Sequence, residues 1–312
     1  MLKKTFYTFL IVLTAFSVQA QQDAQISQYM FNNLYLTPAN AGVDGVTQLS
    51  ALYRTQWTGY QPGGAPTSQL VSFNTPIYKL RSGFGTYILN DHVGPQNNLE
   101  VQAMYAYHLG IKESKLSFGI KLGMYAMSIN GNVYNALNPG DPKIPSGSES
   151  QVRPDLGLGA FYRSEKYYVG LGVNHLIHSK FDFGAAPLRG PLQTHVNITA
   201  GYFYEASFDL KLTFPILIKT DLKQYAVEVG VIGTLKDQMW GGLTYRQTGD
   251  AILLLGYCLT KDKSLKMGYS MDYILKDQKA KAPTTHELML SYQLPVNPGS
   301  GKKVVRTPRY RH

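Results

Sequence analysis

Histidine is the residue type in this sequence best suited to metal binding or acid–base chemistry. The histidines worth considering are His108, His175, His178 and His195. His175 and His178 lie three residues apart, at the end of an expected strand and in the loop after it, so their side chains should point to opposite faces. Because a shared metal ion needs convergent ligands, we expect these histidines to be hydrogen-bonded or solvated, and we predict no metal site.

Other signatures of catalysis or cofactor binding are missing. No nucleophile-elbow sequence marks the serine of a hydrolase. Gly157 and Gly159, like Gly170 and Gly172, alternate within expected strands, where they relieve crowding on one face instead of binding phosphates. Cys258 is the single cysteine, which excludes an intramolecular disulfide and a thiolate metal site. The sequence therefore predicts a non-enzymatic protein without a cofactor.

Composition favours a folded chain rich in β-strands. Of the 312 residues, 44% are hydrophobic, 12% are aromatic and 16% are charged, and 30 are glycine, a mix that suits many glycine-punctuated strands. After residue 20, no apolar run approaches the roughly 18 to 20 residues that a transmembrane helix needs. The net charge of +10 is not gathered into a nucleic-acid-binding patch. We therefore expect no nucleic-acid partner.

The first twenty residues show the order of features found in a secretion signal. Lys3 and Lys4 are followed by a largely apolar stretch, residues 6–16, and by a small-residue cleavage pattern at 18–20. We expect a signal peptide over 1–20 and a mature chain that starts at Gln21. The residue after the expected cleavage site is not cysteine, so no lipid anchor is predicted.

Alternating apolar and polar residues predict β-strands along most of the chain. From Leu116 to Met124, for example, even-numbered positions are apolar and odd-numbered positions are lysine, serine or glycine. Most predicted strands reach the roughly 9 to 11 residues that a tilted strand needs to cross a bilayer. The fourteen predicted strands are residues 46–57, 67–76, 82–92, 98–109, 115–128, 154–163, 167–177, 193–205, 208–220, 224–235, 239–247, 250–260, 264–275 and 285–294.

Connection lengths and charge placement favour an all-β fold, a transmembrane outer-membrane barrel of about 14 antiparallel strands. Taken together, the odd-numbered connections are much longer than the even-numbered ones, as in barrels with long outer loops and short periplasmic turns. The polar faces of the strands carry charges of both signs, which suits a wet lumen, whereas the apolar faces are nearly uncharged. A soluble sandwich or propeller is the alternative. With the N-terminus in the periplasm, the two longest loops, residues 129–153 and 178–192, face outward.

Two local features lead to further expectations. Pro215 interrupts one predicted strand and removes a ladder hydrogen bond, which implies a bulge or a misplaced strand. Aromatic residues near strand ends are consistent with a belt at the membrane interface. These residues are Trp57 and Tyr273 at outer ends, and Tyr107, Tyr167, Tyr204, Trp240 and Tyr292 at periplasmic ends.

We expect the barrel to comprise residues 46–294. The rest of the chain consists of three segments. The first is the signal peptide. The second, residues 21–45, carries too many large apolar side chains for a linker, and it is expected either to pack at the barrel mouth or to plug the lumen. The third, residues 295–312, is a basic periplasmic tail that is either solvated or in contact with an anionic surface or a partner. Its basic residues are Lys302, Lys303, Arg306, Arg309, Arg311 and His312.

Residues 23–76 contain an ordered set of motifs, which read Q-Y-M, P-x-x-A-G, Y-R-x-Q-W and G-A-P-T. Their residues are Gln28, Tyr29, Met30, Pro38, Ala41, Gly42, Tyr53, Arg54, Gln56, Trp57, Gly64, Ala65, Pro66 and Thr67. In these motifs the chain resembles the PorP/SprF outer-membrane proteins of the type IX secretion system. It departs from the family pattern at Asn33, Thr37 and Asn40. These departures bear on the local turn geometry more than on membership of the family.

The resemblance implies an outer-membrane barrel that receives the C-terminal sorting domain of a secreted substrate and holds it at the cell surface. Some relatives serve a gliding adhesin, and others associate with the periplasmic ring of the secretion motor, so translocon or ring components are further possible partners beside outer-membrane lipid. In the outer loops, the apolar residues that could anchor a partner are Tyr134, Leu137, Ile144, Phe181, Phe183 and Leu188. The alternative is that these side chains pack over the barrel mouth.

Two other functions remain open from the sequence. The first is an outer-membrane channel or transporter for small solutes, which would need an open lumen. The second is a lipid-modifying barrel enzyme, which would need a nucleophile and a histidine brought together on the wall.

Overall fold

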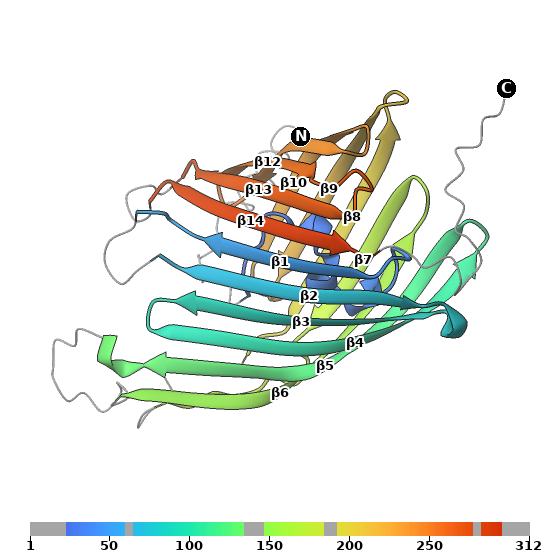
Figure 1. The fold of residues 1–312 in the computed structure, drawn as a ribbon. Helices are drawn as coiled ribbons and strands as arrows, with labels where there is room; N and C mark the ends of the chain where they lie inside the picture. Colours follow the sequence, from blue (N-terminus) through green and yellow to red (C-terminus); the bar gives the residue numbers. More distant parts are fainter. Residues whose placement is uncertain (1–22, 60–64, 134–146, 184–191, 277–281, 295–312) are drawn as a thin grey trace, which may run out of the picture.

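The computed structural model describes residues 23–59, 65–133, 147–183, 192–276 and 282–294. These residues form fourteen antiparallel strands, and β1 pairs with β14 to close a barrel (Figure 1). The predicted barrel is confirmed. The strands are β1 (Gln48–Thr55), β2 (Thr67–Ile77), β3 (Ser82–Val93), β4 (Gln96–Ile111), β5 (Ser114–Asn130), β6 (Ser148–Arg163), β7 (Tyr167–Asn174), β8 (His195–Glu205), β9 (Leu210–Thr220), β10 (Tyr225–Leu235), β11 (Met239–Arg246), β12 (Asp250–Cys258), β13 (Leu265–Ile274) and β14 (Thr284–Gln293).

Exposure alternates along the strands, so one side of the wall faces outward and the other faces the lumen. In β5, Phe118, Leu122 and Met124 are 51%, 56% and 54% exposed, whereas Ser117 and Lys121, at positions of the opposite parity, are buried. The predicted apolar and polar faces of this strand are therefore confirmed. An apolar outer surface around a polar interior is what a barrel in the outer membrane requires.

Pro215 lies within β9 without forming a bulge. It pairs with Gly201 of β8, and β9 keeps one continuous register against β10 on both sides of the proline, as in the pair of Ile216 with Val229. The expectation of a bulge or a misplaced strand is therefore wrong. A proline removes one N–H donor from the ladder, but it adds no residue to the strand, so the register survives.

Most of the aromatic residues predicted for the membrane interface face outward. Tyr107, Tyr167, Tyr204, Tyr273 and Tyr292 are 40–51% exposed. Trp240 does not belong to this belt, because it is only 7% exposed and its ring centroid lies 5.1 Å from that of Phe31 inside the barrel. The parity of β11 explains this difference, since the outward position is held by the preceding residue, Met239.

The connections differ between the two ends of the barrel. The two longest, residues 131–147 between β5 and β6 and residues 175–194 between β7 and β8, leave from the same end. The first of them begins with the short helix η4 (Gly131–Val133). At the opposite end, the helix η3 (Tyr78–Leu80) joins β2 to β3. This difference agrees with the predicted division into long and short connections.

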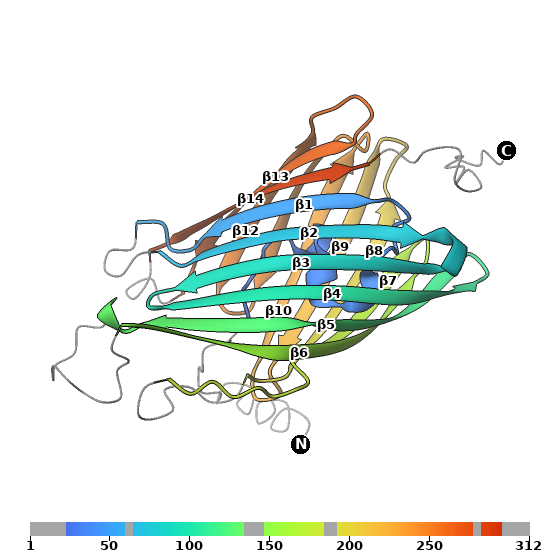
Figure 2. The same ribbon diagram turned by 60° about the horizontal axis from the view of Figure 1, so that its bottom comes forward.

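The segment before β1 lies inside the barrel. It forms the short helices η1 (Tyr29–Phe31), α2 (Asn33–Leu36) and η2 (Pro38–Asn40), which appear in blue between the strands of the wall in Figures 1 and 2. Two positions were expected for this segment, the barrel mouth and the lumen, and it occupies the lumen. Residues 23–47 are called the plug below. Among the described residues, no helix is both long enough and apolar enough to cross a membrane.

Candidate functional site

Glycines of the barrel wall make room for the backbone of the plug. A Cβ atom added at Gly172 of β7 would lie 2.0 Å from the carbonyl oxygen of Leu36. One added at Gly119 of β5 would lie 2.4 Å from the backbone nitrogen of Ala39. The predicted role of Gly172, relief of crowding on one strand face, is thus confirmed, and the crowding comes from the plug. Because the close atoms are backbone, a side chain at either position would force the plug to move.

Apolar side chains of the plug share a core with the wall. Tyr29, Leu34, Tyr35 and Leu36 are each at most 5% exposed. The ring of Tyr35 meets the ring of Tyr87 of β3 edge to face, with 5.7 Å between centroids. The wall residues of this core include Leu52, Leu70, Leu89, Met104, Leu217, Ile252 and Leu254. The plug is therefore part of the packed structure, and its apolar surface would be exposed if it left the lumen.

Arg54 of β1 joins the plug to two acidic residues of the wall. Its guanidinium lies 2.7 Å from the carboxylate of Asp272 and 3.2 Å from that of Glu287. It also donates a 2.8 Å hydrogen bond to the hydroxyl of Ser27. The Glu287 carboxylate accepts hydrogen bonds from the backbone N–H groups of Ser27 and Gln28, at 2.9 and 2.8 Å. Residues 27 and 28 of the plug are therefore held by hydrogen bonds to buried charged groups of the wall.

A second arginine extends this ionic network. Arg246 of β11 lies 2.8 Å from the carboxylate of Glu228, 3.3 Å from that of Asp250 and 3.5 Å from that of Asp272. It also donates a 3.3 Å hydrogen bond to the hydroxyl of Ser27. Arginine and carboxylate charges this deeply buried are stable only when they are paired. These ion pairs all join wall residues, so removing the plug would leave them intact but would take away their hydrogen bonds to Ser27 and Gln28.

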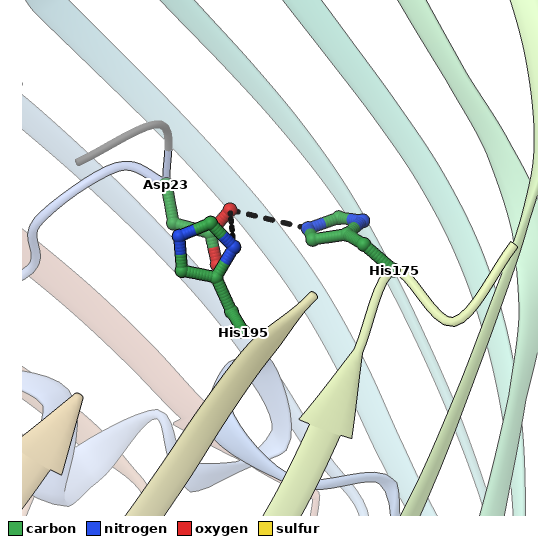
Figure 3. A group of neighbouring side chains, drawn as sticks. All are labelled: Asp23, His175 and His195. Atoms are coloured by element: carbon green, nitrogen blue, oxygen red, sulfur yellow. Dashed lines mark hydrogen bonds and ion pairs between the residues drawn. The ribbon is translucent and has the colours of Figure 1, made fainter. Parts of the chain in front are cut away.

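Asp23 begins the described part of the plug and lies beside two histidines (Figure 3). Its Oδ1 atom is 3.1 Å from Nε2 of His175 and 3.4 Å from Nδ1 of His195. His175 follows β7 and His195 begins β8, and the pairing of Asn174 with His195 brings the two rings together. Within the described residues, these three side chains are the group that could hold a metal ion.

The wall supports His175 from its other side. Nδ1 of His175 lies 3.0 Å from Oδ1 of Asp155 on β6. The other oxygen of Asp155 accepts a 2.8 Å hydrogen bond from Gln102 and lies 3.6 Å from Nζ of Lys121. Burial alone would raise the pKa of Asp23, but His195 and His175 outweigh it and lower this pKa. Burial would lower the pKa of His175, whereas its two carboxylate neighbours raise that pKa to about 10.

Histidine spacing along the chain did not identify this cluster. His178, three residues after His175, has its Nε2 atom 2.9 Å from a threonine hydroxyl, and His108 has its Nδ1 atom 2.7 Å from the hydroxyl of Ser117. Both are hydrogen-bonded, as expected. The partner of His175 is instead His195, across the hairpin of β7 and β8. The register of that hairpin is the signal that could have revealed the pair.

Phe181 and Phe183, two of the predicted partner-binding residues, are completely buried. They pack against Tyr125 and Ile129 of β5 and against Leu192, which corresponds to the alternative that they pack at the barrel mouth. In this conformation they offer no exposed surface to a partner. The other four candidates, Tyr134, Leu137, Ile144 and Leu188, lie outside the described residues.

The motif residues divide between the plug and the first two strands. Gln28, Tyr29, Met30, Pro38, Ala41 and Gly42 belong to the plug, Arg54 lies in β1, and Gln56, Trp57, Ala65, Pro66 and Thr67 lie at or beside the β1–β2 connection. Gly42, with φ of +70°, donates a 2.6 Å hydrogen bond to the side chain of Asn74. Gln56 donates a 2.8 Å backbone hydrogen bond to Pro66 across the connection. Gly64 lies outside the described residues.

Comparison with solved structures shows the fold alone, since identities are low. Two structures of TodX, a Pseudomonas putida toluene transporter, are similar over most of the chain. The deltaS2S3 mutant, described as a monoaromatic hydrocarbon channel, has 10% identity and a TM-score of 0.54, and covers 83% of this chain and 93% of its own. The deltaS2 mutant has 10% identity and a TM-score of 0.51, and covers 85% and 94%. Omp33 of Acinetobacter baumannii has 8% identity and a TM-score of 0.45, and covers 80% and 98%.

Comparison with known sequences gives a family. No curated protein matches the chain. The family model described as type IX secretion system membrane protein PorP/SprF matches residues 18–292, which include the plug, the motifs named above and the described strands up to the last residue but one of β14. This chain therefore belongs to the PorP/SprF family of type IX secretion system membrane proteins, and it is a multi-pass β-barrel of the outer membrane.

Proposed function

We propose that this protein is a non-enzymatic carrier that binds the C-terminal sorting domain of a secreted surface protein, such as a gliding adhesin, and retains it at the cell surface. Family membership supports a role in secretion. The observation that supports a carrier over a pore is the filled lumen, in which the plug shares a core with the wall and forms hydrogen bonds to its buried ion pairs. A closed, rigid barrel is a scaffold, and binding then falls to its loops.

The two long connections at one end of the barrel are the proposed binding surface. The β7–β8 connection is attached to the wall by Phe181 and Phe183 before residues 184–191 and by Leu192 after them. A loop with fixed ends loses less conformational entropy when a partner binds it. The proposed contact residues are Tyr134, Leu137, Ile144 and Leu188. Components of the periplasmic ring are proposed partners of the basic tail, residues 295–312.

Affinity purification tests this proposal. The protein is tagged, extracted from outer membrane in mild detergent, and the co-purifying proteins are identified. We expect a surface protein with a C-terminal sorting domain, and we expect its loss when residues 134–146 or 184–191 are replaced by a short glycine-serine linker. The matched control is Phe208→Ser, which alters an 87% exposed apolar side chain at the opposite end of the barrel. Equal recovery from all variants would refute a role for these loops.

A channel for small solutes is the second candidate, because the TodX structures with this fold are described as hydrocarbon channels. A cavity beside the plug, lined by Tyr29, Tyr35, Lys219 and Glu228 among others, measures about 20 Å³, which is room for about one water molecule. Because the plug also shares a buried core with the wall, we expect no steady conductance from the protein in a planar bilayer. Sustained conductance, with no co-purifying substrate, would favour the channel.

A further inference from the structure

Asp23, His175 and His195 form a cluster that the carrier function does not use. Each offers one potential ligand atom, and these atoms all lie within 4.8 Å of one another. All three residues are at least nine-tenths buried. We propose that these three side chains bind a zinc ion, which fastens the beginning of the plug to the β7–β8 hairpin. This proposal depends on the plug and the wall, and not on which partner the outer loops bind.

The spacing of the ligand atoms suits a tetrahedral zinc site. Zinc–nitrogen and zinc–oxygen bonds are about 2.0 to 2.2 Å long, so neighbouring ligand atoms in a tetrahedral site lie about 3.3 to 3.5 Å apart. The observed separations from Oδ1 of Asp23 are 3.1 Å to Nε2 of His175 and 3.4 Å to Nδ1 of His195. All three ligand atoms lie within 4.8 Å of one another, so small movements of the two rings would bring them onto one ion. Two imidazoles and one carboxylate leave the fourth position for water.

Asp155 supplies the outer support that histidine ligands of zinc usually have. Its carboxylate accepts the Nδ1 proton of His175 in a 3.0 Å hydrogen bond, which directs Nε2 toward Asp23 and leaves it available for a metal ion. Gln102 holds the other carboxylate oxygen at 2.8 Å. This chain of polar contacts orients the ring before any ion binds, as carboxylate–histidine–zinc arrangements do.

The ring of His195 is only partly engaged in hydrogen bonds within the described part of the chain. Nε2 of His195 is buried and has no hydrogen-bond partner within the described part of the chain. Nδ1 of His195 lies 3.1 Å from the carbonyl oxygen of Gln193, a contact that metal coordination through this atom would replace. The nearest lysines are engaged elsewhere, since Lys219 donates to the carbonyl of Ala24 and Lys121 faces Asp155. An ion pair within the cluster is the competing explanation, and a metal-binding measurement separates the two.

The test uses the full-length mature protein, purified in detergent from outer membrane and stripped of metal with a chelator that is then removed. Zinc is added in competition with a chromophoric chelator, and Co²⁺ is added in parallel as a spectroscopic probe. We expect one zinc ion per chain, and visible ligand-field bands of four-coordinate Co²⁺. We expect Asp23→Asn, His175→Gln and His195→Gln to abolish both signals, and Asp155→Asn to weaken zinc binding about 10- to 100-fold.

The matched control is His108→Gln, which changes another buried histidine of the lumen and should leave zinc binding unchanged. Heat-modifiable migration on a gel shows that each variant still forms a barrel. If the folded wild-type protein binds no zinc, or if the three substitutions leave its affinity unchanged while the barrel stays folded, the proposal is wrong. In either case the cluster would be an ion pair that holds the plug.

Discussion

Replacement of Arg54 by methionine tests directly how the plug is held. The change keeps most of the length of the side chain but removes its charge from between two buried carboxylates. It also removes a 2.8 Å hydrogen bond to Ser27. Breaking a buried ion pair by removing one partner typically costs about 3 to 5 kcal/mol, because the remaining charge is left uncompensated.

The expected cost in this protein is at the lower end of that range, about 3 kcal/mol. Asp272 keeps a second cation, since Arg246 lies 3.5 Å from its carboxylate. Glu287 keeps the two backbone N–H donors of the plug, at 2.9 and 2.8 Å. A double variant that adds Glu287→Gln removes the uncompensated charge, so it should recover part of the lost stability.

Tryptophan fluorescence can follow the plug and the barrel separately. In a Trp57→Phe background, the remaining tryptophan is Trp240, whose ring lies 5.1 Å from Phe31 of the plug. Denaturant titration should therefore report loosening of the plug at lower denaturant in Arg54→Met than in the parent. Heat-modifiable migration on a gel reports the wall.

The matched control is Lys211→Met, which removes an exposed pair with Asp237 at 3.8 Å. Exposed pairs of this kind contribute about 1 kcal/mol or less, so this variant should titrate like the parent. If Arg54→Met loses no more stability than Lys211→Met, the ionic network does not hold the plug, and the reasoning fails.

Three further predictions concern the plug and the outer loops. Deletion of residues 21–45 should produce steady conductance in a planar bilayer, because the plug fills the lumen; a silent deletion variant that still forms a barrel would contradict this. Gly172→Val should displace the plug and also produce conductance, since its Cβ would lie 2.0 Å from a plug carbonyl. The control Gly110→Val, with no atom within 4 Å of its added Cβ, should stay closed, and equal conductance of the two variants would refute the close fit. Phe181→Ala should leave a cavity that loosens the β7–β8 connection and lowers substrate recovery in the affinity purification, and unchanged recovery would show that this anchor is dispensable.

Much of the barrel is predictable from the sequence, for a local physical reason. Each residue of a transmembrane strand faces either lipid or lumen, so the alternation of apolar and polar side chains is written in consecutive residues. The parity of residues 116–124 is sufficient to identify the outward face of β5. Strand number follows from the turn residues between such segments, and the motifs of residues 23–76 are sufficient to suggest the family later shown by the family model.

The sequence did not predict which residues meet inside the barrel. The contacts of Arg54 with Asp272 and Glu287 depend on closure of β1 against β14, more than 200 residues apart along the chain. The contact of Asp23 with His175 and His195 depends on where the first residues of the plug lie in the lumen.

The sequence by itself therefore determined the all-β class, the approximate strand positions, the outward and inward faces and the family resemblance. Tertiary structure alone decided that residues 23–47 fill the lumen and that Phe181 and Phe183 are buried. The physical reason is that hydrophobic alternation has a period of two residues and is read locally. Contacts across a lumen depend instead on the register and closure of all the strands together.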